Sequence, residues 1–520
     1  MHLLKSHTII LLIILLHISL RLIIISRPIE EIDSLTMSDD SYLSLKIAQN
    51  IANDKGPFYT TGYTNGFQPL YVFIIAPSYK VFHNDLIKPI YSALIFLLLI
   101  DALTLFFLYK LLNLLCKNKF VPYIAALSYA ITPLTIRTSL NGLETSLSFF
   151  FIVFVFYVLY KNKEKIINEI SNGSLYFFGL IIGLSLLARI DNAVLVVAVF
   201  FYVTFMQVKK GKGFHTRSYF FAILGIMTIV LPWLLYSYIY TGDLYPISGK
   251  AVRYQSIDFV FNFAGKNPYL FILKKFIQQL FKNYLLYIIP IVLFLFALPF
   301  FYSRWKTYID RNVKNLFLTI LIYSIVLVIA YVFYMYTFWY FDRYLFPLIL
   351  IFSITLTLLI DFYITSMSKK NGYLLIAVLV LFVIIGNVIR PGFSRLFFEK
   401  EKEFRGYITI GKWAHEHFKE TTKIGAFQTG SIGYFAEDLI VYNLDGVVDK
   451  KSYEAIVNKR LMDMIKSERI EYLILWDLNL KYLINVSSHF SDNDIQFIQK
   501  IEGANSWDCE WFLYKVNYSD

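Results

Sequence analysis

The chain has 520 residues, of which 57% are hydrophobic and 17% are charged, and its formal net charge is +12. Soluble globular proteins carry about 25% charged residues, so this composition excludes an ordinary soluble domain and predicts a protein that lies largely in a membrane. The positive charge does not indicate nucleic-acid binding, because the Lys and Arg residues lie mostly in short connectors between long apolar runs.

The apolar runs predict an all-α polytopic membrane protein with a bundle of about eleven transmembrane helices. The first run is followed by RPIEEID rather than by a small-residue cleavage site, so it predicts a retained anchor and not a cleaved signal peptide. In chain order the predicted spans are Thr8–Ser26, Pro89–Leu115, Phe120–Ile136, Thr145–Tyr160, Leu175–Leu187, Ala193–Gln207, Ser218–Tyr240, Asn283–Phe301, Asn315–Tyr336, Tyr344–Tyr363 and Tyr373–Ile389.

The charges of the connectors predict the orientation of these spans. Every connector on the cytoplasmic side of this path holds at least two Lys or Arg residues, whereas the short outer loops hold none or one, as at Arg189 and Arg343. This bias predicts a multi-pass protein of the plasma (inner) membrane with a cytoplasmic N-terminus and an extracytoplasmic C-terminus. The apolar stretch Pro69–Phe82 is too short to span and predicts a helix that lies in the outer leaflet.

The pattern changes after the last span. Two helical stretches, Lys412–Lys419 and Tyr453–Lys466, alternate with the strand-like runs KIGAF, LIVYNL, EYLILWD and EWFLYKV. Such alternation predicts a small soluble α/β domain. We therefore expect a transmembrane domain over residues 1–390 and an extracytoplasmic domain over residues 391–520.

The first outer loop, residues 27–88, carries the strongest chemical signal. Its stretch SDDSYLSLKIAQNIA places Leu43 and Ile47 on one helical face with polar residues opposite, which predicts an amphipathic helix on the membrane surface. Asp39 and Asp40 lie at the start of this helix. One carboxylate suffices to cap a helix, and a carboxylate at the membrane surface can also act as a general base toward a sugar hydroxyl.

Motifs of two other chemistries are missing. The stretch Gly242–Ala251 has too many residues between its glycines to form a phosphate-binding loop. His415 and His417 lie two positions apart, so on a helix they face different directions and do not form the zinc-binding pair of a metalloprotease. The sequence therefore argues against an ATP-driven pump and a zinc protease.

Several stretches together resemble a known superfamily. SDDSYLSLKIAQNIA followed by GYTNGFQPLYVF is similar to the first periplasmic loop of GT-C glycosyltransferases, and most similar to that of the terminal arabinofuranosyltransferases of mycobacterial cell walls and related bacterial proteins. Ile190 stands where that group usually has a proline, in its Arg-Pro-Asp motif. Further stretches that agree are NGLETSL, LLARIDNAVL, IYTGDLYPISGKA, DRYLFPL and QTGSIGYFAEDLIVYNLDGVVD.

The resemblance implies a polyprenyl-phosphate-linked sugar donor and a glycan, lipid or protein acceptor outside the membrane. It places the acidic catalytic position at Asp39 or Asp40. The leaving phosphate needs positive charge at the membrane surface, and four residues in the outer segments are candidates to bind it, although contact with lipid headgroups also explains each of them. These candidates are Arg343, Lys250, Arg253 and Arg189.

A divalent cation (Mg, Mn or Ca) is a further expectation. Glu144 in the second outer loop is the candidate ligand, together with an Asp of the first loop, because hard cations prefer carboxylate oxygens. The alternative is that Glu144 supports the start of the helix that follows it.

The main alternative to a glycosyltransferase is a transporter or flippase of a glycan or lipid-linked sugar. Transporters place ionisable groups in the middle of the membrane, and Asp101 is the clearest such residue in this chain. Because most other charges lie in the loops, the sequence favours chemistry at the membrane surface over passage through it.

Overall fold

The computed structural model describes residues 2–83, 85–164, 171–209, 216–262, 265, 267–399, 406–506 and 509–518. Within these residues eight helices are long and apolar enough to cross a membrane, and three shorter apolar helices accompany them. Each coincides with one of the eleven predicted spans. The eight are α1 (His2–Ile25), α6 (Lys88–Leu115), α12 (Ala193–Lys209), α13 (Thr216–Thr241), α15 (Pro268–Ala297), α17 (Arg311–Val328), α19 (Leu348–Ser366) and α20 (Lys369–Val388), and the three are α7 (Val121–Ile131), α9 (Thr145–Lys161) and α11 (Asn172–Ala188).

Several predicted spans differ in their ends from the helices of the structure. The predicted span Phe120–Ile136 is broken at Pro133, where α8 (Pro133–Ser139) begins, because proline has no N–H to continue the helical hydrogen bonds. Helix α15 begins at Pro268 rather than near Asn283, and the Asn267 side chain caps it by accepting the Leu270 N–H at 3.0 Å. Gln279 and Lys282 of this extension bond Asp342.

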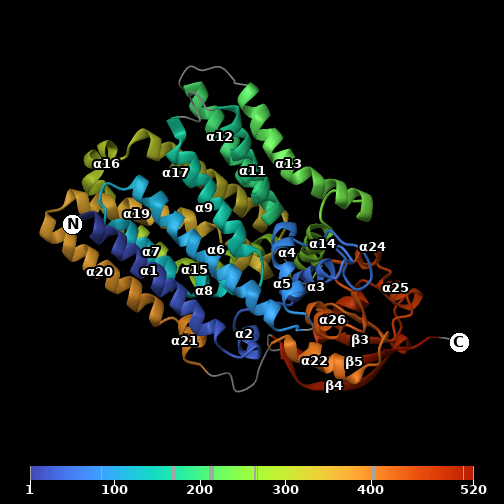
Figure 1. Cartoon of the computed structure of the whole chain (residues 1–520). Coiled ribbons are helices and arrows are strands. Elements are labelled where there is room, and N and C mark those ends of the chain that lie inside the picture. Colours follow the sequence, from blue (N-terminus) through green and yellow to red (C-terminus); the bar gives the residue numbers. More distant parts are fainter. Residues whose placement is uncertain are drawn as a thin grey trace.

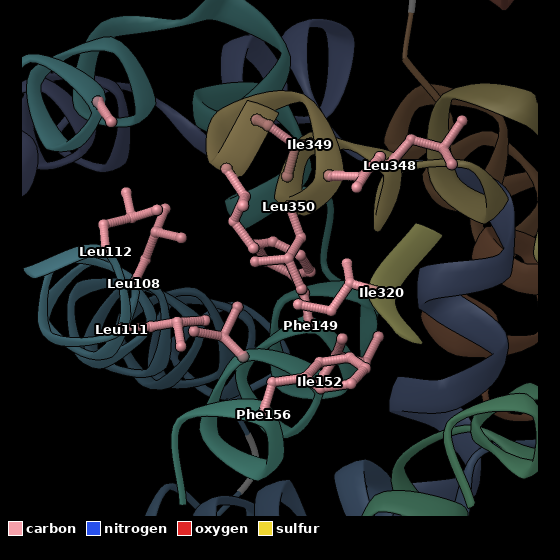
Figure 2. Close-up of a cluster of buried hydrophobic side chains, with 14 of the residues drawn as sticks. Leu108, Leu111, Leu112, Phe149, Ile152, Phe156, Ile320, Leu348, Ile349 and Leu350 are labelled. Carbon is pink, nitrogen blue, oxygen red and sulfur yellow. The ribbon is translucent and has the colours of Figure 1, made fainter. Parts of the chain in front are cut away.

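Much of the bundle packs around a large apolar core. Leu108 and Leu111 of α6, Phe149 and Phe156 of α9 and Ile320 of α17 are all buried in it (Figure 2). Most apolar side chains on the outer faces of α13, α15 and α20 are exposed, as expected of helices that face lipid.

The charges inside the bundle are paired. The Asp101 carboxylate accepts hydrogen bonds from Arg21 Nε at 2.9 Å and from the Tyr129 hydroxyl at 2.6 Å, and His17 Nε2 lies 3.1 Å from it. All four side chains are buried or nearly so. Buried charges in a membrane are tolerated when they are paired, so this cluster joins α1 to α6 and α7.

The predicted first outer loop, residues 27–88, is called the first outer segment below. It contains four short helices, α2 (Ile29–Leu35), α3 (Asp39–Ala52), α4 (Pro69–Ile75) and α5 (Pro77–Val81). Helix α3 forms as predicted, and its placement at the membrane surface stays a prediction. Its polar face is buried as well as its apolar face, with Lys46 and Gln49 only 6% and 7% exposed, because Gln49 bonds Glu437 of the C-terminal region. Helices α4 and α5 are too short to span, and their placement in the outer leaflet stays a prediction.

The predicted C-terminal α/β domain is confirmed. Its sheet has the order β2-β1-β3-β5-β4, in which β2, β1 and β3 are parallel and the last two strands are antiparallel. The sequence missed β4, whose pattern alternates weakly and contains Gly503. The strands are β1 (Lys423–Ala426), β2 (Ile440–Asn443), β3 (Tyr472–Leu475), β4 (Ile495–Ser506) and β5 (Cys509–Val516).

Five helices accompany this sheet. The predicted helical stretch Tyr453–Lys466 forms two helices, α24 and α25, rather than one. The five helices are α22 (Ile408–His417), α23 (Gly430–Phe435), α24 (Lys450–Val457), α25 (Leu461–Ser467) and α26 (Asp477–Asn485).

The C-terminal domain, residues 406–518, shares a core with the first outer segment (Figure 1). Ile32 and Tyr42 of α2 and α3 are buried in the same apolar cluster as Ile424 and Val441 of the sheet. The buried Asp33 carboxylate also accepts the Ile408 N–H at 2.8 Å. The domain is therefore packed against the bundle and does not extend freely from it.

The remaining elements connect the bundle or frame the candidate site. They are η1 (Ile190–Asn192), α14 (Ile247–Asn262), η2 (Leu298–Phe301), α16 (Tyr302–Tyr308), the π-helix η3 (Ile329–Tyr334), η4 (Phe338–Tyr340), α18 (Phe341–Tyr344), α21 (Pro391–Phe397) and η5 (Asp492–Asp494).

Candidate active site

A pocket of about 340 Å³ lies where the bundle meets the C-terminal domain. Asp40 of α3, Arg189 before η1, Arg343 of α18 and Val447 of the C-terminal domain line it. The lining includes both arginines and other polar side chains. It also includes apolar residues from the start of α12, from α14, from the end of α17, from η3 and from the residue after η3: Ala193, Val194, Val252, Leu327, Ala330 and Met335.

Asp40 and Arg343 form an ion pair in this pocket. Arg343 Nη1 donates to Asp40 Oδ2 at 3.0 Å, and its Nη2 donates to the Tyr344 hydroxyl at 3.1 Å. The Asp40 side chain is 34% exposed and that of Arg343 is 16% exposed, so both groups remain within reach of a ligand. A carboxylate and a guanidinium thus face the same small volume.

The residue before Arg343 fixes its position. The Asp342 carboxylate accepts Asn283 Nδ2 at 2.7 Å and Lys282 Nζ at 3.2 Å on α15, and also pairs with Arg137. Burial opposes ionisation of Asp342, but Arg137 and Lys282 outweigh it and hold the pKa of Asp342 well below its usual range. Asp342 therefore anchors α18 to α15 while its neighbour Arg343 enters the pocket.

Arg189 forms the second cationic group of the pocket. It is buried and donates to Glu144 at 2.6 Å, to Asp191 at 3.0 Å and to the Tyr331 hydroxyl at 3.2 Å. Its guanidinium carbon lies 4.9 Å from the centre of the Tyr344 ring, the same distance as that of Arg343. The two arginines are therefore held around one tyrosine, although they lie more than 150 residues apart.

Asp39 has a different role from Asp40. It is 7% exposed and accepts the backbone N–H groups of Gly430 at 2.8 Å and Ser431 at 3.1 Å, at the start of α23. Burial raises its pKa to about 7, against the lowering effect of these two hydrogen bonds. Neither aspartate caps α3, whose N-cap residue is Ser38. Asp39 instead joins the first outer segment to the C-terminal domain.

Two of the four predicted phosphate-binding residues do not line the pocket. Lys250 pairs with Asp243, and Arg253 donates to the Tyr334 carbonyl at 3.3 Å and lies over the Tyr334 ring. Both lie on α14, whose pocket-facing residues are instead Ser248, Gly249 and Val252. Their part in phosphate binding stays a prediction.

Glu144, the candidate metal ligand, lines the pocket but bonds Arg189. Among the described residues no group of three or more His, Cys, Asp or Glu side chains is placed to hold a metal ion. Because the Glu144 carboxylate is bonded to the buried Arg189 guanidinium, it does not fit the role of a cation ligand in this arrangement. Binding of a divalent cation stays a prediction.

Three tyrosines around Arg343 and Arg189 form the aromatic part of the site. Tyr331 and Tyr344 stack with ring centres 4.6 Å apart, and Tyr340 packs against Tyr344 at 5.5 Å. Tyr331 belongs to the π-helix η3, and such local widening of a helix is common at functional sites. The run YVFYMYTFWYFDRY was the available signal, but an aromatic belt at a membrane surface has the same composition.

Comparisons with known proteins agree with this architecture. Residues 67–236 match the model of the family described as dolichyl-phosphate-mannose-protein mannosyltransferase, and residues 393–515 match a domain of unknown function (DUF8728). No curated protein matches the sequence.

Two solved structures share the fold at low sequence identity. The archaeal oligosaccharyltransferase AglB from Archaeoglobus fulgidus, in complex with an inhibitory peptide and a dolichol-phosphate, is 15% identical with a TM-score of 0.54, over 91% of this chain and 69% of that chain. ArnT from Cupriavidus metallidurans, bound to undecaprenyl phosphate, is 11% identical with a TM-score of 0.54, over 96% of this chain and 97% of that chain.

These matches confirm the predicted class: the fold is that of the GT-C membrane glycosyltransferases. The finer resemblance to terminal arabinofuranosyltransferases stays a prediction. The comparisons give no support to the transporter or flippase alternative, and the buried Asp101 cluster does not line the pocket.

Proposed function

We propose that this protein is a membrane glycosyltransferase that moves a sugar from a polyprenyl-phosphate donor to a hydroxyl group of an acceptor. The observation that carries the proposal is the ion pair between Asp40 and Arg343 in a pocket that is lined by both polar and apolar side chains. The pocket thereby combines a base, a phosphate-binding cation and a surface for a lipid chain.

The donor phosphate is bound by Arg343 and Arg189. A guanidinium binds phosphate oxygens through two parallel N–H groups, and the two arginines flank Tyr344 from the same pocket. Because Arg343 bonds Asp40 in the structure, an arriving phosphate competes with Asp40 for the same guanidinium. The polyprenyl chain packs against the apolar residues of the pocket, among them Val194 and Leu327.

Asp40 is the general base of the transfer. As the acceptor oxygen bonds to the first carbon of the donor sugar, the Asp40 carboxylate takes the proton of that hydroxyl. The bond between the sugar and the phosphate oxygen breaks, and the phosphate leaves with the electron pair. Arg343 and Arg189 stabilise the negative charge that develops on the leaving phosphate.

The reaction takes place on the outer side of the membrane. This part of the proposal rests on the Lys and Arg residues of the connectors. The eleven apolar helices among the described residues, of which eight are long enough to span by themselves, support it, since an odd number of spans places the two termini on opposite sides. The N-terminus is then cytoplasmic and the C-terminal domain is extracytoplasmic. The acceptor is a glycan, a lipid or a protein at that surface.

Binding of undecaprenyl phosphate to the full-length protein in lipid nanodiscs tests the phosphate site. Arg343→Ala should weaken this binding about 10-fold to 100-fold, because hydrogen bonds to charged groups contribute about 1.5–3 kcal/mol. Arg27→Ala is the matched control, since Arg27 is an arginine of the segment between α1 and α6 that pairs with Glu31 and does not line the pocket. Equal affinity of the wild type for undecaprenol, which lacks the phosphate, would contradict the proposal.

A further inference from the structure

The pocket is lined by three uncharged polar side chains that the transfer mechanism does not use. Ser44 of α3, Gln68 at the start of α4 and Ser248 of α14 line it together with Asp40 and the two arginines. None of the three side chains makes a hydrogen bond to another described residue, whereas the Asp40 carboxylate and both guanidinium groups are paired. The hydrogen-bonding capacity of these three side chains is therefore available to a ligand.

Ser44 lies beside the proposed base. It follows Asp40 by four positions on α3, so the two side chains share one face of the helix, and Leu43 between them also lines the pocket. Ser44 is only 7% exposed, and its unpartnered hydroxyl is not one of the polar atoms that the fold seals off from solvent. Because Ser44 lines the pocket, this hydroxyl is open to the pocket, one helical turn from Asp40.

Gln68 is held near the arginines by the helix that it precedes. Its half-buried side chain does not cap α4. Tyr71 of α4 donates to the Gly142 carbonyl at 2.8 Å, and Glu144, two residues after Gly142, bonds Arg189. Helix α4 is therefore fixed to the loop that positions Arg189, while the Gln68 amide remains available to the pocket.

Ser248 is brought to the same pocket by a buried asparagine of the first outer segment. Asn65 Nδ2 donates to the Asp243 carbonyl at 3.1 Å, and Asn65 Oδ1 accepts the Ile247 N–H at 3.0 Å. Ser248 is the next residue after Ile247, and Gln68 follows Asn65 by three positions. Asn65 therefore joins the start of α14, with Ser248, to the segment that carries Gln68.

The chemistry of these three side chains suits a sugar. A serine hydroxyl and a glutamine amide can each donate and accept hydrogen bonds, as each sugar hydroxyl can. The phosphate and the lipid chain of the donor have other partners in the pocket, the arginines and the apolar residues. Because the donor sugar is bonded to the phosphate, it enters the same pocket and needs partners for its hydroxyl groups there.

We propose that Ser44, Gln68 and Ser248 form the subsite that binds the hydroxyl groups of the donor sugar, and that they select which sugar is transferred. This inference rests on the proposed function and names the residues that recognise the sugar. The arginines bind a phosphate that every polyprenyl-phosphate donor carries, so they do not distinguish one sugar from another. A site that hydrogen-bonds hydroxyl groups of its substrate, in contrast, rejects analogues that lack them.

The test measures donor and acceptor use separately. A lipid extract of source cells that lack the protein supplies the unused donor, and delipidated envelope from the same cells supplies the acceptor. The full-length protein in nanodiscs catalyses the transfer, and mass spectrometry quantifies the product. Ser44→Ala and Gln68→Ala should each raise the half-saturating amount of lipid extract about 3-fold to 10-fold, as expected for loss of a neutral hydrogen bond. The half-saturating amount of envelope and the affinity for undecaprenyl phosphate, which carries no sugar, should not change.

Ser34→Ala is the matched control, because Ser34 is a half-buried serine of the same outer segment that does not line the pocket. An unchanged lipid requirement, a rise in the envelope requirement instead, or an equal loss of affinity for undecaprenyl phosphate would overturn the subsite. If Ser44→Ala does not fold, Ser248→Ala at a half-buried position should raise the lipid requirement, and no rise would also overturn it.

Failure of the proposed function gives a different result. A wild type that neither transfers sugar nor binds undecaprenyl phosphate would refute the proposed function itself. A wild type that binds undecaprenyl phosphate but neither binds nor transfers any sugar-linked lipid of the extract would overturn the subsite and leave the phosphate site in place.

Discussion

The two single variants Asp40→Asn and Asp39→Asn should affect different properties. Asp40→Asn should lower the rate of transfer, whereas Asp39→Asn should lower the stability of the fold. Asp40→Asn keeps a carbonyl oxygen for Arg343 but removes the basic group, so the rate of transfer should fall about 10²-fold or more. Because Asp40 makes no bond to the C-terminal domain that the structure shows, the melting temperature should change little. Binding of undecaprenyl phosphate should be retained.

The effect of Asp39→Asn follows from its two hydrogen bonds. The carboxylate accepts N–H groups from Gly430 and Ser431 with one oxygen each. An asparagine offers one oxygen and one NH2 group, so one of the two buried N–H groups loses its acceptor. An unsatisfied buried group costs about 1–3 kcal/mol, which should lower the melting temperature by several degrees and loosen the docking of the C-terminal domain.

Thermal unfolding in nanodiscs and the transfer assay together distinguish the two variants. Asp54→Asn serves as the control, because Asp54 lies in the same outer segment with its side chain 88% exposed. The reasoning is wrong if Asp40→Asn keeps more than about a tenth of the wild-type rate. It is also wrong if Asp39→Asn lowers the rate as much as Asp40→Asn while the melting temperature is unchanged.

Two further predictions concern pH and topology. Burial raises the pKa of Asp33 to about 6 and that of Asp39 to about 7, so the folded state binds more protons than the unfolded chain between about pH 4 and pH 7. The melting temperature should therefore fall as the pH rises from 5 to 7, and Asp39→Asn should flatten this dependence; a rise over this range would contradict it. A reporter fused after Lys119 should be cytoplasmic and one fused at Asp520 external, and an external signal after Lys119 would mean that Pro69–Phe82 spans.

Much of the bundle could be predicted because its determinants are local. Each span is a run of apolar residues whose length is set by membrane thickness, so the eleven predicted spans coincide with eleven helices in the structure. The strand runs KIGAF and EYLILWD were recognisable for the same reason, since each is a short apolar segment between polar turns. Strand β4 was missed because pairing with β5, and not its own composition, makes it a strand.

The sequence also predicted that four charged residues lie at the outer ends of helices: Asp39, Asp40, Arg189 and Arg343. Only the tertiary structure determined which residues each of them contacts. Asp39 and Asp40 are adjacent, yet one contacts Gly430 and the other contacts Arg343. Likewise, α3 has an amphipathic pattern whose polar face is covered by a domain that begins more than 350 residues later. Residue type and helical period can be read from neighbouring residues in the sequence. The partner of a charged group depends instead on which distant segments fold against it.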